Sequence, residues 1–596
     1  MNVSITVRHC GETTTLRAEA GTPLAPLLRE AGLLTLPCGV GKCGKCLILA
    51  ATEPCAEERA LLGDAALASG LRLACYTRAA EGLDIALPQA GALRVLTRFA
   101  QSDYPFRPIV ERRPFAMPEP SLDDQRSDLQ RLIDACGAKG HALGLGQLAA
   151  LPAFIRNARS NGGCGDGHGN VCGFGLMHGE TLVGYTASDE AYALIVDIGT
   201  TTVAALLVDT ARRRVVAARG EHNAQSPYGA DVISRIQYTL EQPDGLQELS
   251  QRSREQVWAL IERALARCGR EADTLREIAL VGNTVMQHLF AGYSVRSIAA
   301  APFQPETLFD ASETVPLHGV PVRFAPCVAG YVGGDITAGL LAAGLAELPG
   351  EHLFLDIGTN GEMALGGRGG FTCCAVASGP AFEGAGISCG MPGVDGAVSR
   401  VRYDRGFVYD VIGGGAPKGL CGSGLLDLTA VLLRLGAIAP GGRLLPPEQA
   451  PAALRRHLTR DTDGNGCFHL TPEISLTAAD VRNLQLAKAA VAAGIRVLLQ
   501  QRGLTPEQLD GVYLAGGFGS YLDPESAAAI GMLPRACAGK LHTLGNTALA
   551  GAAVLTLDGA QWQRIRSISR ACSYLEFSGR ADFAAAFTEN LSFPQP

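Results

Sequence analysis

The sequence lacks the features that would place it in a membrane or on nucleic acid. No uninterrupted apolar run reaches the ~20 residues that a membrane-spanning helix needs. Residues 1–20 have no basic start followed by an apolar stretch, so no secretory leader is predicted. The net charge is −7, and the 51 lysines and arginines are scattered rather than gathered into a stripe. We therefore expect a cytoplasmic protein with small-molecule and protein partners, and no membrane or nucleic-acid role.

The sequence also has no G-x-x-x-x-G-K-S/T motif, which excludes the P-loop class of nucleotide-binding proteins. Hydrophobic residues at 47% and 73 glycines are typical of a compact, turn-rich α/β protein. At 596 residues the chain exceeds the ~250 to 300 residues that one core serves, so we expect three or four units. The 18 cysteines favour a reducing, anaerobic setting, where thiols serve as iron ligands or small core residues.

Four cysteines near the N-terminus have the spacing of an iron-sulfur protein. LPCGVGKCGKC, with a distant Cys in RLACYTR, is the plant-type C-x4-C-x2-C pattern with a fourth ligand. The intervening glycines let the backbone curl closely around inorganic sulfide. A zinc knot or buried structural thiols are the alternative, although a tetrahedral zinc site normally pairs two C-x2-C units. The pattern predicts a two-iron, two-sulfur (2Fe-2S) cluster with the ligands Cys38, Cys43, Cys46 and Cys75.

The sequence around these cysteines predicts a small β-rich unit. Apolar and polar residues alternate over residues 3–7, residues 13–16 suit a second strand, and residues 23–31 suit a short helix. Cys10 and Cys55 fall outside the cluster pattern and are expected to be ordinary thiols.

A change of pattern follows this unit. Residues 94–120 lose periodicity and gain five prolines with several arginines between them, which indicates an extended linker. From residue 123 to about 158 apolar residues return at helical spacing, which predicts a small middle domain. The glycine-rich segment from Cys164 to Cys172 indicates a mobile loop, with a second metal site as the alternative.

Two similar segments shape the rest of the chain. ALIVDIGTTTVAALLVD and HLFLDIGTNGEMAL each have a continuous apolar run, an aspartate, a glycine turn with threonine, and a return strand. Asp197 and Asp356 lead the two copies. The sequence therefore predicts an internally duplicated pair of subdomains that face each other across a cleft.

The repeated Asp-Ile-Gly-Thr suits phosphate binding. Glycine removes side-chain bulk at the turn, so backbone N–H groups and threonine hydroxyls can reach phosphate oxygens, and the aspartates can hold Mg²⁺ directly or through water. LAGGFGSYLD and CGSGLLDL add two glycine clusters that suit nucleotide contacts, with plain helix-entry turns as the alternative. The candidate nucleotide-binding residues are Gly199, Thr200, Thr201, Thr202, Gly358, Thr359, Asn360, Gly422, Ser423, Gly424, Gly516, Gly517 and Gly519.

These motifs resemble two known folds. Residues 1–90 resemble the β-grasp ferredoxin domain, which implies the four cysteines above as iron ligands. The motif set after residue 190 resembles the superfamily of acetate and sugar kinases, Hsp70 and actin. That resemblance implies phosphate motifs at 197–202 and 356–360, an adenosine motif at 516–519 and a connecting motif near 545–551.

The whole chain is similar to the reductive activators of corrinoid proteins. The phrases YGADVISRIQ, VGNTVMQHLF, VGGDITAG, ASGPAFEGAGI and ENLSFP carry the likeness in this order. It implies an ATPase that drives an electron from the cluster to a corrinoid protein, returning Co(II) to Co(I) for methyl transfer. It also implies Mg²⁺, an external low-potential electron donor and a homodimer formed through the ATPase domain. The implied catalytic residues are Asp197, Asp356, Asp335 and Glu362, of which the last two could also be solvated turn carboxylates.

The expected fold is multidomain α/β. It comprises a β-grasp ferredoxin domain over residues 1–90, a Pro/Arg-rich linker over 91–120, a middle domain over 121–190 and a duplicated RNase H-like ATPase domain of actin/Hsp70 type over 191–596. Three other functions share parts of this pattern: an activator of radical dehydratases, a small-molecule kinase with a redox-sensing iron-sulfur domain, and a ferredoxin-like module with a dead ATPase. The iron ligands in an appended N-terminal domain disfavour the first, and the lack of an identifiable acceptor pocket disfavours the second.

Overall fold

The structure is a computed structural model. It describes residues 2–9, 12–31, 46–59, 67, 70–87, 110–160, 170–187, 191–210, 212, 214–270, 272–311, 313–460, 464–516 and 522–595. Among the described residues, none of the helices combines the length and the apolar character that crossing a lipid bilayer requires.

The N-terminal unit is a five-stranded sheet with one helix packed on it, in the strand order β2-β1-β5-β3-β4. Strand β1 pairs antiparallel with β2 and parallel with β5. The predicted alternation in β1 is confirmed, because Val3, Ile5 and Val7 are buried in one core with Leu28 of α1. This is the β-grasp arrangement expected from the sequence. Its elements are β1 (Asn2–His9), β2 (Glu12–Glu19), α1 (Leu24–Glu30), β3 (Leu47–Ala50), β4 (Leu71–Leu73) and β5 (Leu83–Ala86).

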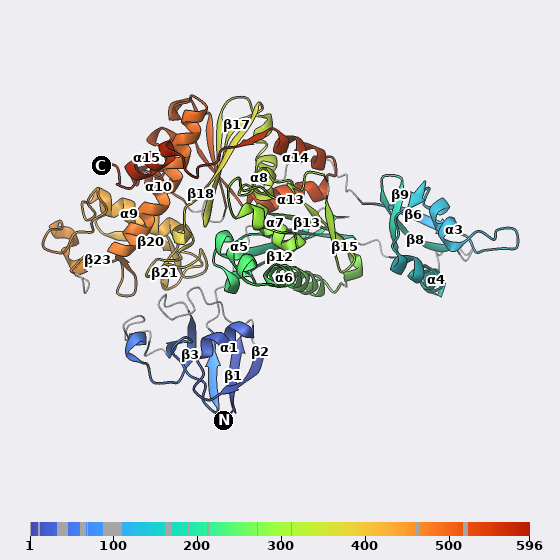
Figure 1. The fold of residues 1–596 in the computed structure, drawn as a ribbon, viewed down its shortest axis with the longest axis horizontal. Helices are drawn as coiled ribbons and strands as arrows, with labels where there is room; N and C mark the ends of the chain where they lie inside the picture. The colour runs from blue at the N-terminus through green and yellow to red at the C-terminus, as the bar shows by residue number, and fades with distance from the viewer. Residues whose placement is uncertain are drawn as a thin grey trace.

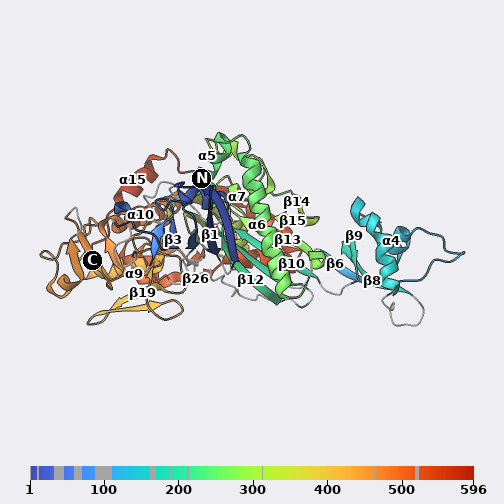
Figure 2. The same ribbon diagram turned by 90° about the horizontal axis from the view of Figure 1, so that it is seen from below.

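The next unit is a four-stranded sheet in the order β6-β8-β9-β7, with two helices in its core. It lies at one end of the molecule in both views (Figures 1 and 2). The predicted linker over 91–120 contains a strand near its end, because residues 111–117 form β6 and pair with β8. Pro114 is compatible with β6 because this is an edge strand, in which the N–H groups on the outer side make no ladder hydrogen bond. The elements are β6 (Glu111–Met117), α3 (Asp128–Ala135), β7 (Gly140–His141), α4 (Leu145–Ser160), β8 (Val171–His178) and β9 (Thr181–Thr186).

Two predicted features of this region lie outside the described residues. They are the linker up to residue 109 and most of the glycine-rich segment between Cys164 and Cys172. Cys172 itself belongs to β8.

Two six-stranded sheets form the remaining core, and five strands of each repeat one topology. Their orders are β12-β11-β10-β13-β15-β14 and β26-β25-β16-β17-β18-β27. In each sheet a central strand starts an antiparallel meander on one side, β10-β11-β12 or β16-β17-β18. On its other side each central strand has two successive parallel neighbours, β13 and β15 or β25 and β26. The predicted internal duplication is therefore confirmed.

The first half spans residues 192–348. Its central strand β10 is buried at nearly every position, as the continuous apolar run predicts. Helices α5, α6 and α7 share a core with one side of this sheet. The elements are β10 (Tyr192–Ile198), β11 (Thr202–Asp209), β12 (Arg214–His222), η1 (Ser226–Tyr228), α5 (Val232–Glu241), α6 (Gly245–Arg267), η2 (Ala272–Thr274), β13 (Leu275–Gly282), α7 (Thr284–Ala291), η3 (Arg296–Ile298), β14 (Thr314–Leu317), β15 (Val320–Phe324), α8 (Gly334–Ala343) and η4 (Leu345–Glu347).

The second half spans the rest of the chain. Its sheet packs on the long helix α10, and two three-stranded sheets, β20-β19-β21 and β22-β23-β24, are inserted before that helix. The elements are β16 (His352–Ile357), β17 (Asn360–Gly367), β18 (Gly370–Ala377), η5 (Pro380–Glu383), β19 (Ala397–Tyr403), β20 (Phe407–Val411), β21 (Gly419–Leu420), α9 (Gly422–Arg434), η6 (Ala452–His457), β22 (Leu458–Arg460), β23 (Gly466–His469), β24 (Ser475–Thr477), α10 (Ala478–Gln501), η7 (Pro506–Gln508), β25 (Gly511–Ala515), α12 (Pro524–Ala529), η8 (Arg535–Lys540), β26 (Leu541–Gly545), α13 (Thr547–Leu557), α14 (Gln561–Arg570), β27 (Cys572–Tyr574) and α15 (Ala581–Glu589).

Helices α8 and α13 join the two halves. One apolar cluster contains residues of both helices and of both sheets, and Figure 1 shows α8 and α13 together in the centre of the molecule. Their crossing is tight, because a Cβ on Gly551 would lie 2.1 Å from the backbone oxygen of Ala338. Gly551 belongs to the connecting motif expected near residues 545–551.

Candidate functional site

Asp197 and Asp356 lie at equivalent places, near the carboxyl ends of the central strands β10 and β16. A tight turn follows each of them. The N–H of Gly199 donates to the Thr202 carbonyl at 2.9 Å, and the N–H of Gly358 donates to the Asn360 carbonyl at 2.9 Å. Thr202 and Asn360 then begin the return strands β11 and β17. The two predicted phosphate motifs thus have the same structure in each half: a central strand, a tight turn and an antiparallel return strand.

Four carboxylates gather between these turns. Asp335, in the first turn of α8, and Glu362, on β17, interact electrostatically with both Asp197 and Asp356. Glu362 is buried and the three aspartates are half-buried. The structure therefore brings together all four residues that the sequence proposes as catalytic.

The surroundings disfavour negative charge on this cluster. Burial raises the pKa of Asp197 to about 6, although a hydrogen bond from Asn546 acts in the opposite direction. Burial and then the charge of Asp197 raise the pKa of Asp356 to about 7. Burial and then Asp356 raise the pKa of Asp335 to about 8, and burial with the same neighbours raises that of Glu362. A set of oxygen donors that resists ionisation in this way suits a divalent cation, which would stabilise all of the charged forms.

The raised pKa values predict a pH dependence of stability in the metal-free protein. These carboxyls hold protons more tightly in the folded chain than in the unfolded chain, where their pKa is about 4, so stability falls as the pH rises from about 4 towards 8. We expect the Tm in chelator to fall between pH 6 and pH 8, and to fall less in Asp335→Asn. Calorimetry across this range checks it, with the exposed Asp410→Asn as control. Equal slopes in wild type and Asp335→Asn would contradict the assignment.

Two asparagines that the sequence analysis did not single out hold two of the carboxylates. The side-chain amide of Asn546 donates to Asp197 Oδ2 at 3.0 Å, and that of Asn283 donates to Glu362 Oε1 at 2.8 Å. Each asparagine is also a helix N-cap, so its own oxygen is fixed by a backbone N–H of α13 or α7. The repeated tripeptide Gly-Asn-Thr, at 282–284 and 545–547, is the signal that could have revealed them.

Glu383, at the end of η5, is a further residue that the sequence analysis missed. Its Oε2 accepts a hydrogen bond from the Thr201 hydroxyl at 2.9 Å, and its Oε1 accepts one from the Thr359 N–H at 3.1 Å. The Thr201 and Thr359 hydroxyls are themselves 3.5 Å apart. One carboxylate therefore connects the two phosphate turns.

Arg235 on α5 supports the first of these turns from behind. Its side chain is fully buried, and its guanidinium donates to the carbonyls of Thr200 and Gly229. Burial lowers the pKa of Arg235 to about 9, against the nearby charge of Asp231. A buried cation that donates to the Thr200 carbonyl fixes the backbone of this turn and places a positive charge next to it.

The predicted adenosine motif is only partly described. Gly516 follows β25 with φ +83°, and a Cβ there would lie 2.6 Å from Asp356 Oδ1. A side chain at this position would therefore crowd the carboxylate cluster. Gly517 and Gly519 lie outside the described residues.

Gly422, Ser423 and Gly424 begin α9 and make packing contacts. A Cβ on Gly422 would lie 1.9 Å from the Phe382 carbonyl oxygen, and the Ser423 hydroxyl donates to the Ser399 carbonyl at 2.9 Å. Gly422 therefore packs against Phe382, the neighbour of Glu383. The proposed nucleotide contact of the three residues remains a prediction.

Two of the four cluster cysteines are described. Cys46 is buried, and its thiol lies within hydrogen-bonding reach of Cys75. The Ala74 N–H donates to the Cys46 carbonyl at 2.7 Å, which holds the two segments together. Burial and the neighbouring Cys75 raise the pKa of the Cys46 thiol to about 12, so its thiolate needs a compensating cation such as iron. The pair fits a cluster site; Cys38 and Cys43 lie outside the described residues.

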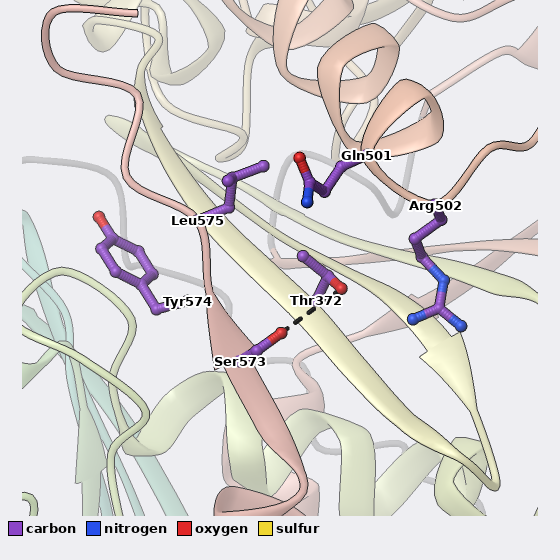
Figure 3. A pocket seen from close by; sticks show the side chains of 6 residues that line it. All are labelled: Thr372, Gln501, Arg502, Ser573, Tyr574 and Leu575. Carbon is purple, nitrogen blue, oxygen red and sulfur yellow. Dashed lines mark hydrogen bonds between the residues drawn. The ribbon is translucent and has the colours of Figure 1, made fainter.

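A surface pocket of about 460 Å³ lies elsewhere, at the edge formed by β18 and β27 (Figure 3). Its Arg502 forms a bidentate ion pair with Glu351 at 2.7 and 2.9 Å. Tyr574 points away from the other labelled side chains in Figure 3 and donates to Glu576 at 2.8 Å. The pocket contains no residue of the carboxylate cluster. It is lined by Thr372, Gln501, Arg502, Ser573, Tyr574 and Leu575.

Comparison with known sequence families assigns most of this arrangement. Residues 7–80 match the 2Fe-2S iron-sulfur cluster binding domain, and residues 351–596 match the C-terminal domain of RACo, an ASKHA domain. Residues 100–161 and 192–348 match the RACo linker region and the RACo middle region. The family's middle region is thus the first half of the duplicated pair described above.

Individual relatives agree with the families. The corrinoid activation enzyme RamQ of Eubacterium limosum is 29% identical over 593 residues, with 94% of each chain covered. The Co(II) methylated amine-specific corrinoid protein reductase of Methanosarcina barkeri is 24% identical over 418 residues, covering 64% of this chain and 72% of that relative. A solved structure of a reductive activator for corrinoid, iron-sulfur protein is 32% identical with a TM-score of 0.73, covering 99% of this chain and 98% of its own. The resemblance expected from the sequence is confirmed: this chain belongs to the family of reductive activators of corrinoid proteins.

Proposed function

We propose that this chain uses ATP to drive a low-potential electron from its 2Fe-2S cluster to a corrinoid protein, returning Co(II) corrinoid to Co(I) for methyl transfer. The observation that carries the proposal is the joining of two sites in one chain. A β-grasp unit brings Cys46 and Cys75 together, and a duplicated ATPase core brings Asp197 and Asp356 together. The named relatives act on corrinoid proteins, which supports this choice of partner.

Thermodynamics explains why such a transfer needs ATP. A plant-type cluster has a reduction potential of about −400 mV. Each ~60 mV by which the potential of a one-electron acceptor lies below that value lowers the equilibrium constant for electron transfer about tenfold. Nucleotide binding can offset that cost if it favours one docked arrangement of donor and acceptor over another. ATP then acts as a gate and driver of the transfer, and not as a phosphate donor to a small molecule.

The residues around the cleft have distinct parts in this scheme. Asp197 and Asp356 would hold Mg²⁺ directly or through water, and Asp335 and Glu362 would complete its acidic surroundings. The turns at Thr200 and Thr359 present N–H and hydroxyl groups to the phosphates. When bound, the cluster supplies a one-electron carrier. We further propose a cytoplasmic, anaerobic setting, an external electron donor and a homodimer formed through residues 191–596.

The direct test is corrinoid reduction by the whole protein. Cluster-loaded chain, a Co(II) corrinoid protein and a low-potential reductant are mixed without oxygen, and the Co(I) spectrum is followed with ATP or with its non-hydrolysable imido analogue. We expect Co(I) to accumulate with ATP, and far less without nucleotide. Co(I) formation that is indifferent to ATP would refute the proposal, and stoichiometric phosphorylation of a small molecule would favour the kinase alternative.

A further inference from the structure

We propose that Glu383 is a gate of the nucleotide site: its carboxylate bridges the two phosphate turns in the nucleotide-free chain and must leave them when ATP binds. This inference rests on the proposed ATP-binding function. It assigns Glu383 a role in regulating access to that site.

The first argument is that Glu383 uses the donors that phosphate needs. The Thr201 hydroxyl and the Thr359 N–H are both candidate phosphate contacts, and both donate to this one carboxylate at 2.9 and 3.1 Å. Gly358 permits the approach, because a Cβ there would lie only 3.1 Å from Glu383 Oε1. An anionic carboxylate in this position resembles a phosphate group in its charge and in the two donors from which it accepts.

The second argument is electrostatic. Glu383 also faces Asp356, whose pKa it helps to raise. Phosphate groups entering the same space would meet a negative charge at hydrogen-bonding distance, which is strongly unfavourable at a partly buried place. The carboxylate and the phosphates therefore compete for one position.

The third argument is that the Glu383 side chain can turn away while the backbone of η5 stays in place. Phe382 is buried, and the close approach of Gly422 holds its carbonyl. Glu383 itself is half-buried and so has a route to solvent. Gly379 and Gly384 flank η5 with φ values of +72° and +76°, which makes the segment a tight, separate turn. Movement can then be confined to one side chain.

The bridge also crosses between the halves. Thr201 belongs to the first half and Thr359 to the second, so Glu383 ties the halves together until nucleotide replaces it. Nucleotide binding would then exchange one link between the halves for another.

The test is nucleotide affinity in the full chain, measured by calorimetry with the Mg²⁺ complex of the imido analogue of ATP. Glu383→Gln keeps the size and removes the charge, so we expect binding on the order of tenfold tighter than wild type. The matched control is Glu313→Gln, because Glu313 also accepts from a threonine hydroxyl and a backbone N–H but contacts neither phosphate turn. Its affinity should equal that of wild type.

A second readout is independent of nucleotide. Without ATP, hydrogen exchange of the Thr359 N–H should be faster in Glu383→Gln, because a neutral amide oxygen accepts more weakly than a carboxylate. Binding by wild type without any gain in Glu383→Gln would overturn the gate alone, as would weaker binding by that variant. Failure of both proteins to bind the nucleotide would overturn the proposed ATPase function together with the gate.

Discussion

Replacing Asp197 with Asn should lower ATP hydrolysis roughly 100- to 1,000-fold, because the site loses a charge that meets Mg²⁺ and the phosphates. Asparagine keeps the volume and an oxygen that can still accept from the Asn546 amide, which donates to Asp197 at 3.0 Å. The fold should therefore persist. Phosphate release measures the loss, and the visible spectrum of the iron cluster should remain that of wild type.

The control for this experiment is Asp410→Asn, since Asp410 is a surface aspartate paired with Arg402 outside the cleft. Hydrolysis in that variant should match wild type. Retention of near-normal hydrolysis in Asp197→Asn would place the catalytic metal elsewhere. Loss of the iron spectrum together with hydrolysis would show unfolding instead, which a thermal melt identifies.

Replacing Cys46 with Ala should abolish corrinoid reduction while ATP hydrolysis continues. Cys46 is buried beside Cys75, so its removal takes away one of four predicted iron ligands at a place that solvent cannot fill. Iron and sulfide content should fall, and the visible absorption of the cluster should be lost. The carboxylate cleft is built from other units, so phosphate release should stay near the wild-type rate.

Cys55→Ala is the matched control, because Cys55 lies in the same N-terminal unit but outside the cluster pattern. It should keep the iron and the activity. Co(I) formation that survives in Cys46→Ala would refute the electron path through this cluster.

The sequence predicted those parts of the molecule whose signal is local. The apolar runs before Asp197 and Asp356 became the buried central strands of two equivalent sheets, and the C-x4-C-x2-C spacing indicated the ferredoxin-like unit. These patterns work because strand burial and ligand spacing are both set within a few residues. Pro114 favoured an irregular linker over a strand, because the sequence around it does not reveal that residues 111–117 form a strand at the edge of a sheet.

The missing residues depend on distant partners. Asn546 contacts Asp197 across 349 positions of sequence, and Glu383 reaches Thr201 across 182. The repeated Gly-Asn-Thr marks Asn546 as notable but does not name its partner, and no residue next to Glu383 in the chain reveals its contact with Thr201. The threonines and aspartates of the turns could be predicted from the sequence. Their hydrogen-bond partners Asn546 and Glu383 could be identified only from the way the two halves are arranged in space.

The close crossing at Gly551 determines how the two halves can move. Helix α13 touches the backbone of α8 at Gly551 and carries Asn546 as the cap of its first turn. Two helix backbones this close cannot slide far past each other, so the halves can more readily rotate about this crossing. Rotation about that point would move Asn546 relative to Asp197, the carboxylate expected to meet the metal.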